Sequence, residues 1–237
     1  MTSANWIDRI NICSLLASLK QKVGVPDDVT TKQIQPILNQ TLTTIKENQI
    51  YLTILTALLE HEETLLRHSF HVTVYSLAIA SKLNMTAKEL HQLALAALLH
   101  DIGKISIRPA VLNKPGRLTQ KEYDEIKTHT IWGLWYLQSH ATFPTGIQEV
   151  VVQHHERLDG SGYPYHLTAE YIHPWAKIVA VSDVFDALTA KRCYKQAMSP
   201  IEALSVLQHD IDRKLDATYV TLLASCIATP IMSKYKD

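Results

Sequence analysis

Two short stretches decide the fold and the chemistry of this chain: HDIGK at residues 100–104 and HHERLDGSGYP at residues 154–164. The first places a histidine and an aspartate at the end of an apolar segment, where core packing alone does not favour them. The second places two histidines side by side, and burying both is costly unless each has a partner. Together they predict a site for more than one metal ion, built on helices.

Apolar side chains recur at helical spacing along most of the chain, and no alternating run is long enough to demand a sheet. We therefore expect an all-α protein. The expected helices cover residues 5–20, 32–63, 65–83, 86–101, 119–140, a segment ending at 154–155, and residues 174–190, 200–209 and 216–227. Pro36 is expected in the first turn of its helix, and Gly103 is expected to stop the helix that ends at HD. Residues 108–119 and 158–164 are expected to be loops.

The composition excludes several classes of protein. Lys plus Arg equals Asp plus Glu at 23 each, so no global field attracts a nucleic-acid polymer or an anionic membrane. Cys13, Cys193 and Cys226 are odd in number and far apart, which is typical of reduced thiols. We find no signal peptide and no apolar run of membrane-spanning length. A cytoplasmic location is the expectation.

Each candidate ligand also has a plainer explanation. His100 could complement a helix dipole, and His154 and His155 could be one structural and one exposed histidine. As adjacent helix residues they diverge by about 100°, which favours two neighbouring metals over one. Asp183 lies in an apolar helical pattern and needs a cation or hydrogen-bond donors.

His68 and His129, taken alone, are more often core or surface histidines than ligands. The five histidines and two aspartates taken together nevertheless support a metal site more strongly than any one of them does alone. Its mixed imidazole and carboxylate donors suit iron or manganese, and zinc or nickel less well.

The order of these motifs resembles the HD-GYP family of cyclic-di-GMP phosphodiesterases, a branch of the HD metal-dependent phosphohydrolases. The resemblance covers about residues 55–227 and includes AALLHDIGKI, LNKPGRLT, HHERLDGSGYP and VSDVFDALTAKRCYK. It implies an HD-type helical bundle over residues 55–237. Residues 1–54 would form a small helical N-terminal segment that regulates or dimerises.

The resemblance also implies roles for single residues. The first metal would be held by His68, His100, Asp101 and Asp183, and the second by His129, His154 and His155, with Asp101 as the bridge. Asp101 and Lys104 would be catalytic. The substrate would be contacted by Lys104, Tyr163, Arg192 and Lys195. For Arg192 and Lys195 a solvated helix end remains the alternative.

Three departures from the family pattern qualify these expectations. Some members carry a glutamate, a ligand of a third metal, where this chain has Thr64, so two metals are expected. His71 replaces the arginine of the usual HSxRV. Cys193 replaces the proline of the usual RPY.

The implied reaction is hydrolysis of cyclic-di-GMP to pGpG, to GMP, or to both, by a hydroxide that bridges two divalent metals, iron or manganese. The two aspartates only partly offset the charge of two metals, so the site would attract an anion although the protein is neutral. Alternatives are a non-hydrolytic cyclic-di-GMP sensor or docking module, and a phosphohydrolase of another cyclic dinucleotide or of a nucleotide monophosphate. A second copy, a diguanylate cyclase or another signalling protein are further candidate partners.

Overall fold

The computed structural model describes residues 28–190, 197–211 and 213–233. Within these ranges the structure contains helices and no β-strand, which confirms the all-α prediction. The helices are α2 (Asp28–Glu47), α3 (Gln49–His61), α4 (Glu63–Ala80), α5 (Ala87–Leu99), the 3-10 helix η1 (Ile102–Ser106), α6 (Pro109–Leu112), α7 (Gln120–Lys127), α8 (His129–His140), α9 (Thr145–Gln153), α10 (Pro174–Thr189), α11 (Pro200–His209) and α12 (Ala217–Ser233).

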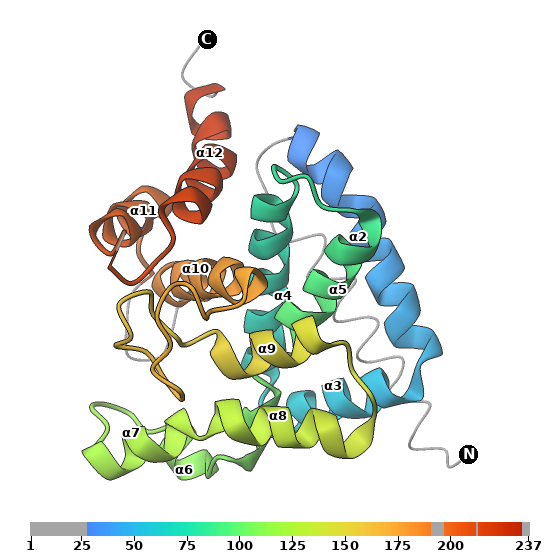
Figure 1. Cartoon of the computed structure of the whole chain (residues 1–237), viewed down its shortest axis with the longest axis vertical. Coiled ribbons are helices and arrows are strands. Elements are labelled where there is room, and N and C mark those ends of the chain that lie inside the picture. Colours follow the sequence, from blue (N-terminus) through green and yellow to red (C-terminus); the bar gives the residue numbers. More distant parts are fainter. Residues whose placement is uncertain (1–27, 191–196, 212, 234–237) are drawn as a thin grey trace.

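Helix α4 is the centre of the bundle. It packs against α5 and α10 most extensively and also contacts α3 and α12. Helix α9 packs against α5, and α8 lies along one edge of the molecule against η1 and α9 (Figure 1). Ser76 of α4 donates a hydrogen bond to Ser182 of α10 at 3.0 Å, and both are buried. These small side chains let the two helices approach closely, and each of the two carries metal-type residues.

Helix starts follow the signals in the sequence. Thr86 caps α5 and Thr119 caps α7, each in a capping box with the glutamate three residues on. Ser199 caps α11 in the same way. The helices predicted at 174–190 and 200–209 are confirmed, as is the one at 65–83, with α4 shifted to Glu63–Ala80. The helix predicted at residues 5–20 lies outside the described residues.

The single helix predicted over residues 32–63 is wrong. It is divided at Asn48, which adopts an extended conformation and accepts a hydrogen bond from the Ile50 amide to start α3. Asparagine is a strong N-cap residue, so its side chain can start α3 once the chain turns at this position. Pro36 is also misplaced by the prediction, since it lies well inside α2 and not in its first turn.

Three further predictions need correction. The helix predicted from Thr119 to His140 is two helices that meet at Thr128. The loop predicted at residues 108–119 contains the short helix α6. Gly103 does not stop the preceding helix, because α5 ends at Leu99 and Gly103 belongs to η1.

One apolar core runs through the described helices. Ile34, Ile37 and Ile45 of α2 belong to the same cluster as Leu66 of α4 and Leu93 of α5. Residues 28–54 therefore pack onto the bundle, while a separate regulatory or dimerising role for residues 1–54 stays a prediction. None of the described helices is long and apolar enough to cross a bilayer.

The contact between α2 and α5 includes a polar bridge at His91. Its Nδ1 lies 3.1 Å from the Thr41 hydroxyl and its Nε2 lies 3.2 Å from the Thr44 hydroxyl. Thr41 donates its hydroxyl proton to the Ile37 carbonyl, so His91 donates through Nδ1 and accepts from Thr44 through Nε2. Burial lowers the pKa of His91 below its usual value of about 6.5, because the charged form loses hydration.

This lowered pKa gives a prediction for stability. Below about pH 6.5 the unfolded chain binds a proton at His91 more readily than the folded chain does. The free energy of unfolding therefore decreases as the pH is lowered. We expect His91→Gln to flatten this fall by a few tenths of a kcal/mol between about pH 7 and about pH 5.5. Urea titrations at each pH measure it. The same substitution at the exposed His209 is the control for replacing a histidine by glutamine away from the contact between α2 and α5. A profile that His91→Gln does not flatten contradicts the prediction.

Candidate metal centre

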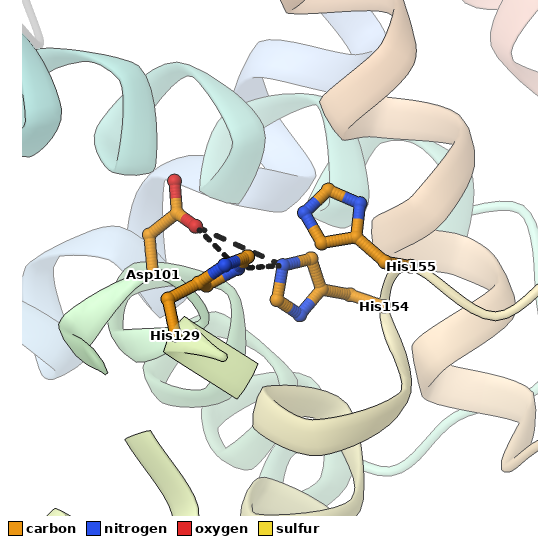
Figure 2. A group of neighbouring side chains, drawn as sticks. All are labelled: Asp101, His129, His154 and His155. Atoms are coloured by element: carbon orange, nitrogen blue, oxygen red, sulfur yellow. Dashed lines mark hydrogen bonds and ion pairs between the residues drawn. The ribbon is translucent and has the colours of Figure 1, made fainter. Parts of the chain in front are cut away.

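Asp101 is the centre of the candidate site. It follows α5, is 1% exposed, and carries two oxygens that face different histidines. Its Oδ2 lies 3.5 Å from Nε2 of His68 and 3.3 Å from Nε2 of His100. Its Oδ1 lies 3.4 Å from Nε2 of His129 and 3.7 Å from Nε2 of His154 (Figure 2). One carboxylate therefore separates two groups of imidazoles, as a bridging ligand would.

Asp183 on α10 closes the site from the other side. Its Oδ1 lies 3.1 Å from Nε2 of His68, and its Oδ2 lies 3.9 Å from Nδ1 of His155. The structure thus brings together all seven residues that the sequence proposed as ligands, from α4, the end of α5, α8, the end of α9 and α10: His68, His100, Asp101, His129, His154, His155 and Asp183. Their role as ligands stays a prediction.

The adjacent histidines do not diverge as helix residues would. His154 is the C-cap of α9 and His155 lies beyond the helix, so the helical angle between them does not apply. Donor atoms of both lie within 4.8 Å of those of Asp101 and His129, and all four side chains turn toward one space (Figure 2). A single metal could use both histidines, contrary to the expectation from helix geometry that they would serve two metals.

Three of the histidines are oriented by backbone carbonyls that lie just before them in the sequence. The Nδ1 atoms of His100, His129 and His154 lie within hydrogen-bond distance of backbone carbonyls three residues earlier, at 2.7, 2.6 and 3.1 Å. A carbonyl only accepts, so each Nδ1 carries the proton and each Nε2 presents its lone pair to the centre. This arrangement fixes the tautomer that a metal needs.

Two orphaned atoms test whether the residues fit a metal. Among the described residues, buried Nε2 of His100 and buried Oδ1 of Asp101 have no hydrogen-bond partner. Burying such atoms without partners costs free energy, and a cation between them would remove the cost. Groups of donors within 4.8 Å are formed by Asp101, His129, His154 and His155, and by His68, His100 and Asp101. The donor set fits two divalent cations with mixed nitrogen and oxygen ligands.

The electrostatics differ between the two groups. Burial lowers the pKa of His129 to about 3 and outweighs the nearby Asp101 carboxylate. Burial also lowers the pKa of His154 and, more strongly, of His155, so these imidazoles are neutral and can bind a cation without losing a proton. Burial opposes a charge on His68 as well, but hydrogen bonds with Asp183 and Asp186 raise its pKa to about 9.

The aspartates stay ionised. Burial raises the pKa of Asp101, but the charge of Lys104 and the neighbouring His100 outweigh burial and hold this pKa well below its usual range. Burial likewise opposes the charge of Asp183, and His68 lowers the pKa of Asp183 well below its usual value. Both carboxylates can therefore serve as anionic ligands.

A close glycine contact holds Asp101 near His129. A Cβ on Gly103 would lie 1.8 Å from the His129 carbonyl oxygen and 2.4 Å from the Gly133 nitrogen. Only glycine permits this approach of η1 to α8. The contact sets the distance between the carboxylate that precedes η1 and the histidine that begins α8.

The GYP segment is packed on the backbone of the histidine pair. A Cβ on Gly162 would lie 2.4 Å from the Arg157 nitrogen and 2.5 Å from the His155 carbonyl oxygen. The Tyr163 ring stacks on the His155 ring with centroids 4.7 Å apart, and burial raises the pKa of Tyr163. Tyr163 therefore forms one wall of the candidate site, while its contact with a substrate stays a prediction.

Of the remaining residues predicted to contact the substrate, the structure describes only Lys104. Lys104 donates a hydrogen bond to Oδ2 of Asp101 at 2.5 Å, and its side chain is mostly buried. Arg192 and Lys195, with Cys193 between them, lie outside the described residues. Thr64, which replaces the third-metal glutamate, is exposed and donates a hydrogen bond to Glu62.

Two site residues were missed by reasoning from the sequence. Asp186, one turn after Asp183, accepts hydrogen bonds at the site and is 2% exposed. Glu156, directly after the histidine pair, is 2% exposed and accepts from the amides of Tyr165 and Leu167 at 2.6 and 3.1 Å. It thereby ties the GYP segment to the end of α9. Both residues are visible in the sequence as carboxylates within the quoted motifs. Their hydrogen-bond partners, however, are brought to them only by tertiary packing.

A family model described as HD domain matches residues 45–219. Among characterised relatives, the "3'3'-cGAMP-specific phosphodiesterase 3" of Vibrio cholerae is 36% identical over 149 residues, which are 63% of this chain and 32% of that protein. The "Cyclic di-GMP phosphodiesterase response regulator RpfG" of Xanthomonas campestris pv. campestris is 42% identical over 146 residues, 61% of this chain and 39% of that protein. The chain thus spans about a third of the length of these relatives.

A solved structure gives the same fold. "Bd1817, a HDG"Y"P protein from Bdellovibrio bacteriovorus" superposes with a TM-score of 0.63 at 22% identity, covering 92% of this chain and 70% of that one. At this identity the likeness supports the arrangement of helices and says nothing of a shared substrate.

Proposed function

Because the chain belongs to the HD domain family, and within it to the HD-GYP group, we propose that it is a metal-dependent phosphodiesterase that hydrolyses cyclic-di-GMP. The proposed products are pGpG, GMP or both. Relatives named for cyclic-di-GMP and for 3'3'-cGAMP support the broader class of cyclic dinucleotides as substrates.

One observation carries this proposal. The two oxygens of buried Asp101 face two separate groups of histidines, at 3.3–3.5 Å on one side and 3.4–3.7 Å on the other. A bridging carboxylate between two cation sites is suited to phosphodiester cleavage, in which both the attacking and the leaving oxygen need stabilisation. Two of the buried unpartnered atoms among the described residues, Nε2 of His100 and Oδ1 of Asp101, lie at this centre, where a cation would pair with them.

The seven residues would hold two divalent ions, with iron and manganese as the proposed metals. When bound, such ions lower the pKa of water and neutralise phosphate charge. The chain itself supplies the rest. The histidines present fixed lone pairs, Asp101 links the two groups, and Lys104 offers a cation beside Asp101 that can donate to a phosphate oxygen. The Tyr163 ring beside His155 offers an aromatic wall for a planar base.

A second substrate is favoured by the comparisons. The relative from Vibrio cholerae is named for 3'3'-cGAMP and matches over 63% of this chain, against 61% for the cyclic-di-GMP phosphodiesterase of Xanthomonas campestris pv. campestris. The two substrates differ in one base, so a base-reading contact would decide between them. Non-hydrolytic sensing of either molecule is the remaining alternative.

The deciding experiment incubates purified protein, loaded with Mn²⁺ or with Fe²⁺ under anaerobic conditions, with cyclic-di-GMP, 3'3'-cGAMP or cyclic-di-AMP. Chromatography of the products over time reports turnover, preference and the end product. Hydrolysis of cyclic-di-GMP that stops on chelation is expected. Binding without hydrolysis under every metal condition would replace the enzyme proposal by the sensor alternative.

Lys104 provides a separate test of the chemistry. Charge on the phosphate oxygens grows toward the transition state, so a nearby ammonium should stabilise that state most. We expect Lys104→Met to lower kcat by about 100-fold while both metals stay bound. Lys88 on the exposed start of α5 is the matched control, and Lys88→Met should leave kcat unchanged. Unaltered kcat in Lys104→Met would remove this lysine from the mechanism.

A further inference from the structure

Asp186 lies outside the proposed ligand set but makes two short contacts, one of them to the proposed ligand His68. Its Oδ2 is 2.7 Å from Nδ1 of His68, and its Oδ1 is 3.0 Å from Nδ1 of His71. Both oxygens of one buried carboxylate are therefore occupied by imidazoles from successive turns of α4. The contact joins α4 to α10 directly beside the candidate metal centre.

Asp186 fixes the proton on one ring nitrogen of His68. An ionised carboxylate only accepts hydrogen bonds, so Nδ1 of His68 donates to Asp186. Its Nε2 faces Asp183 at 3.1 Å and Asp101 at 3.5 Å, and this nitrogen would bind a cation in place of a proton. His100, His129 and His154 instead donate from Nδ1 to backbone carbonyls three residues earlier. Among these four histidines, His68 alone depends on a side chain for its orientation.

We propose that Asp186 is a positioning residue that orients His68 as a ligand, with His71 holding the second oxygen of Asp186. The inference rests on the proposed metal site, but it concerns only the group formed by His68, His100 and Asp101. His71 stands where the family pattern has an arginine, and its imidazole supplies one donor to Asp186. Loss of Asp186 should thus weaken one metal site and spare the other.

The test measures binding of Mn²⁺ alone, by calorimetry and elemental analysis, and needs no turnover. Asp186→Asn keeps the size of the side chain but removes its charge and one acceptor. A partner to a ligand histidine is typically worth about 10–100-fold in metal affinity, and we expect a loss in that range at one of two sites. His71→Ala should cost less, because it leaves the bond between Asp186 and His68 in place.

Two backgrounds identify which site is affected. His129→Ala disables the group of Asp101, His129, His154 and His155, and His100→Ala disables the other group. Asp186→Asn should weaken Mn²⁺ binding in the His129→Ala background and leave it unchanged in the His100→Ala background. Equal losses in both backgrounds, or a loss in neither, would overturn the positioning role. Wild-type protein that binds no Mn²⁺ would instead overturn the proposed function.

A spectroscopic readout separates positioning from general damage. With ¹⁵N-labelled histidine and diamagnetic Zn²⁺, long-range nitrogen–proton correlations report which ring nitrogen carries the proton. His68 should be protonated at Nδ1 in the wild type and should lose this single form in Asp186→Ala. A retained Nδ1–H form in that variant, with the thermal midpoint unchanged, would contradict the inference.

Discussion

Replacing Asp101 by alanine is expected to abolish cyclic dinucleotide hydrolysis, with a loss of at least about 1,000-fold in kcat/KM, and to release both metals. The reason is geometric, because Oδ1 and Oδ2 of this one residue face the two groups of histidines. Loss of a ligand that belongs to one group should empty only that group. His129→Ala is the matched comparison, and we expect it to retain one metal.

The amide variant sharpens this prediction. In Asp101→Asn one side of the bridge remains an acceptor while the other becomes an NH₂ group that repels a cation. We expect a single metal per chain and a loss of turnover close to that of Asp101→Ala. Elemental analysis of protein loaded with Mn²⁺, with circular dichroism as the check on folding, measures both variants. Two metals retained in Asp101→Ala, or near-normal hydrolysis, would dismiss the bridging role and the mechanism built on it.

The ligand set could be predicted from the sequence because its signals are local. HDIGK and HHERLDGSGYP place polar residues where an apolar helix ends, and such placement needs a chemical reason. The capping boxes at Thr86 and Thr119 are local in the same sense, since the residues that start each helix lie within four positions of one another. The structure brings these separate signals to one point.

Other features depend on contacts that no short window contains. Asn48 has a side chain that can cap a helix, yet whether it ends one long helix depends on how α2 and α3 pack on the bundle. Asp186 resembles any carboxylate at the end of a helix until α4 places His68 and His71 against it. The divergence expected for His154 and His155 does not apply because α9 ends at Gln153, with His154 as its C-cap and His155 beyond it.

Gly103 is singled out by the sequence, but the role predicted for it is wrong. A glycine shortly after an apolar helix usually ends that helix, and the sequence pattern predicts this. Here the helix has already ended, and the glycine is required because η1 and α8 come into backbone contact. The distance between Asp101 and His129 thus depends on the absence of one methyl group.

Gly103→Ala is therefore expected to separate the two halves of the metal centre. The new methyl group would lie 1.8 Å from the His129 carbonyl oxygen and 2.4 Å from the Gly133 nitrogen. Both are backbone atoms, so no side chain can turn aside and α8 must move away from η1. Moving α8 carries His129 away from Oδ1 of Asp101, which it now faces at 3.4 Å. We expect one metal to be lost, hydrolysis to fall at least about 100-fold, and the fold to lose about 1–3 kcal/mol from overpacking.

Gly133→Ala is the matched control across the same contact. Its methyl group would meet the Cγ1 atom of buried Val151 at 2.7 Å and would lie 3.3 Å from the Gly103 nitrogen, so it crowds a side chain of α9 more than the backbone of η1. Alanine also favours the helix by about 1 kcal/mol over glycine, which offsets part of the crowding. Gly133→Ala should therefore keep two metals and most of its activity. If Gly103→Ala binds two metals as tightly as the wild type, or if the two variants lose metal equally, the glycine contact does not set the spacing between Asp101 and His129.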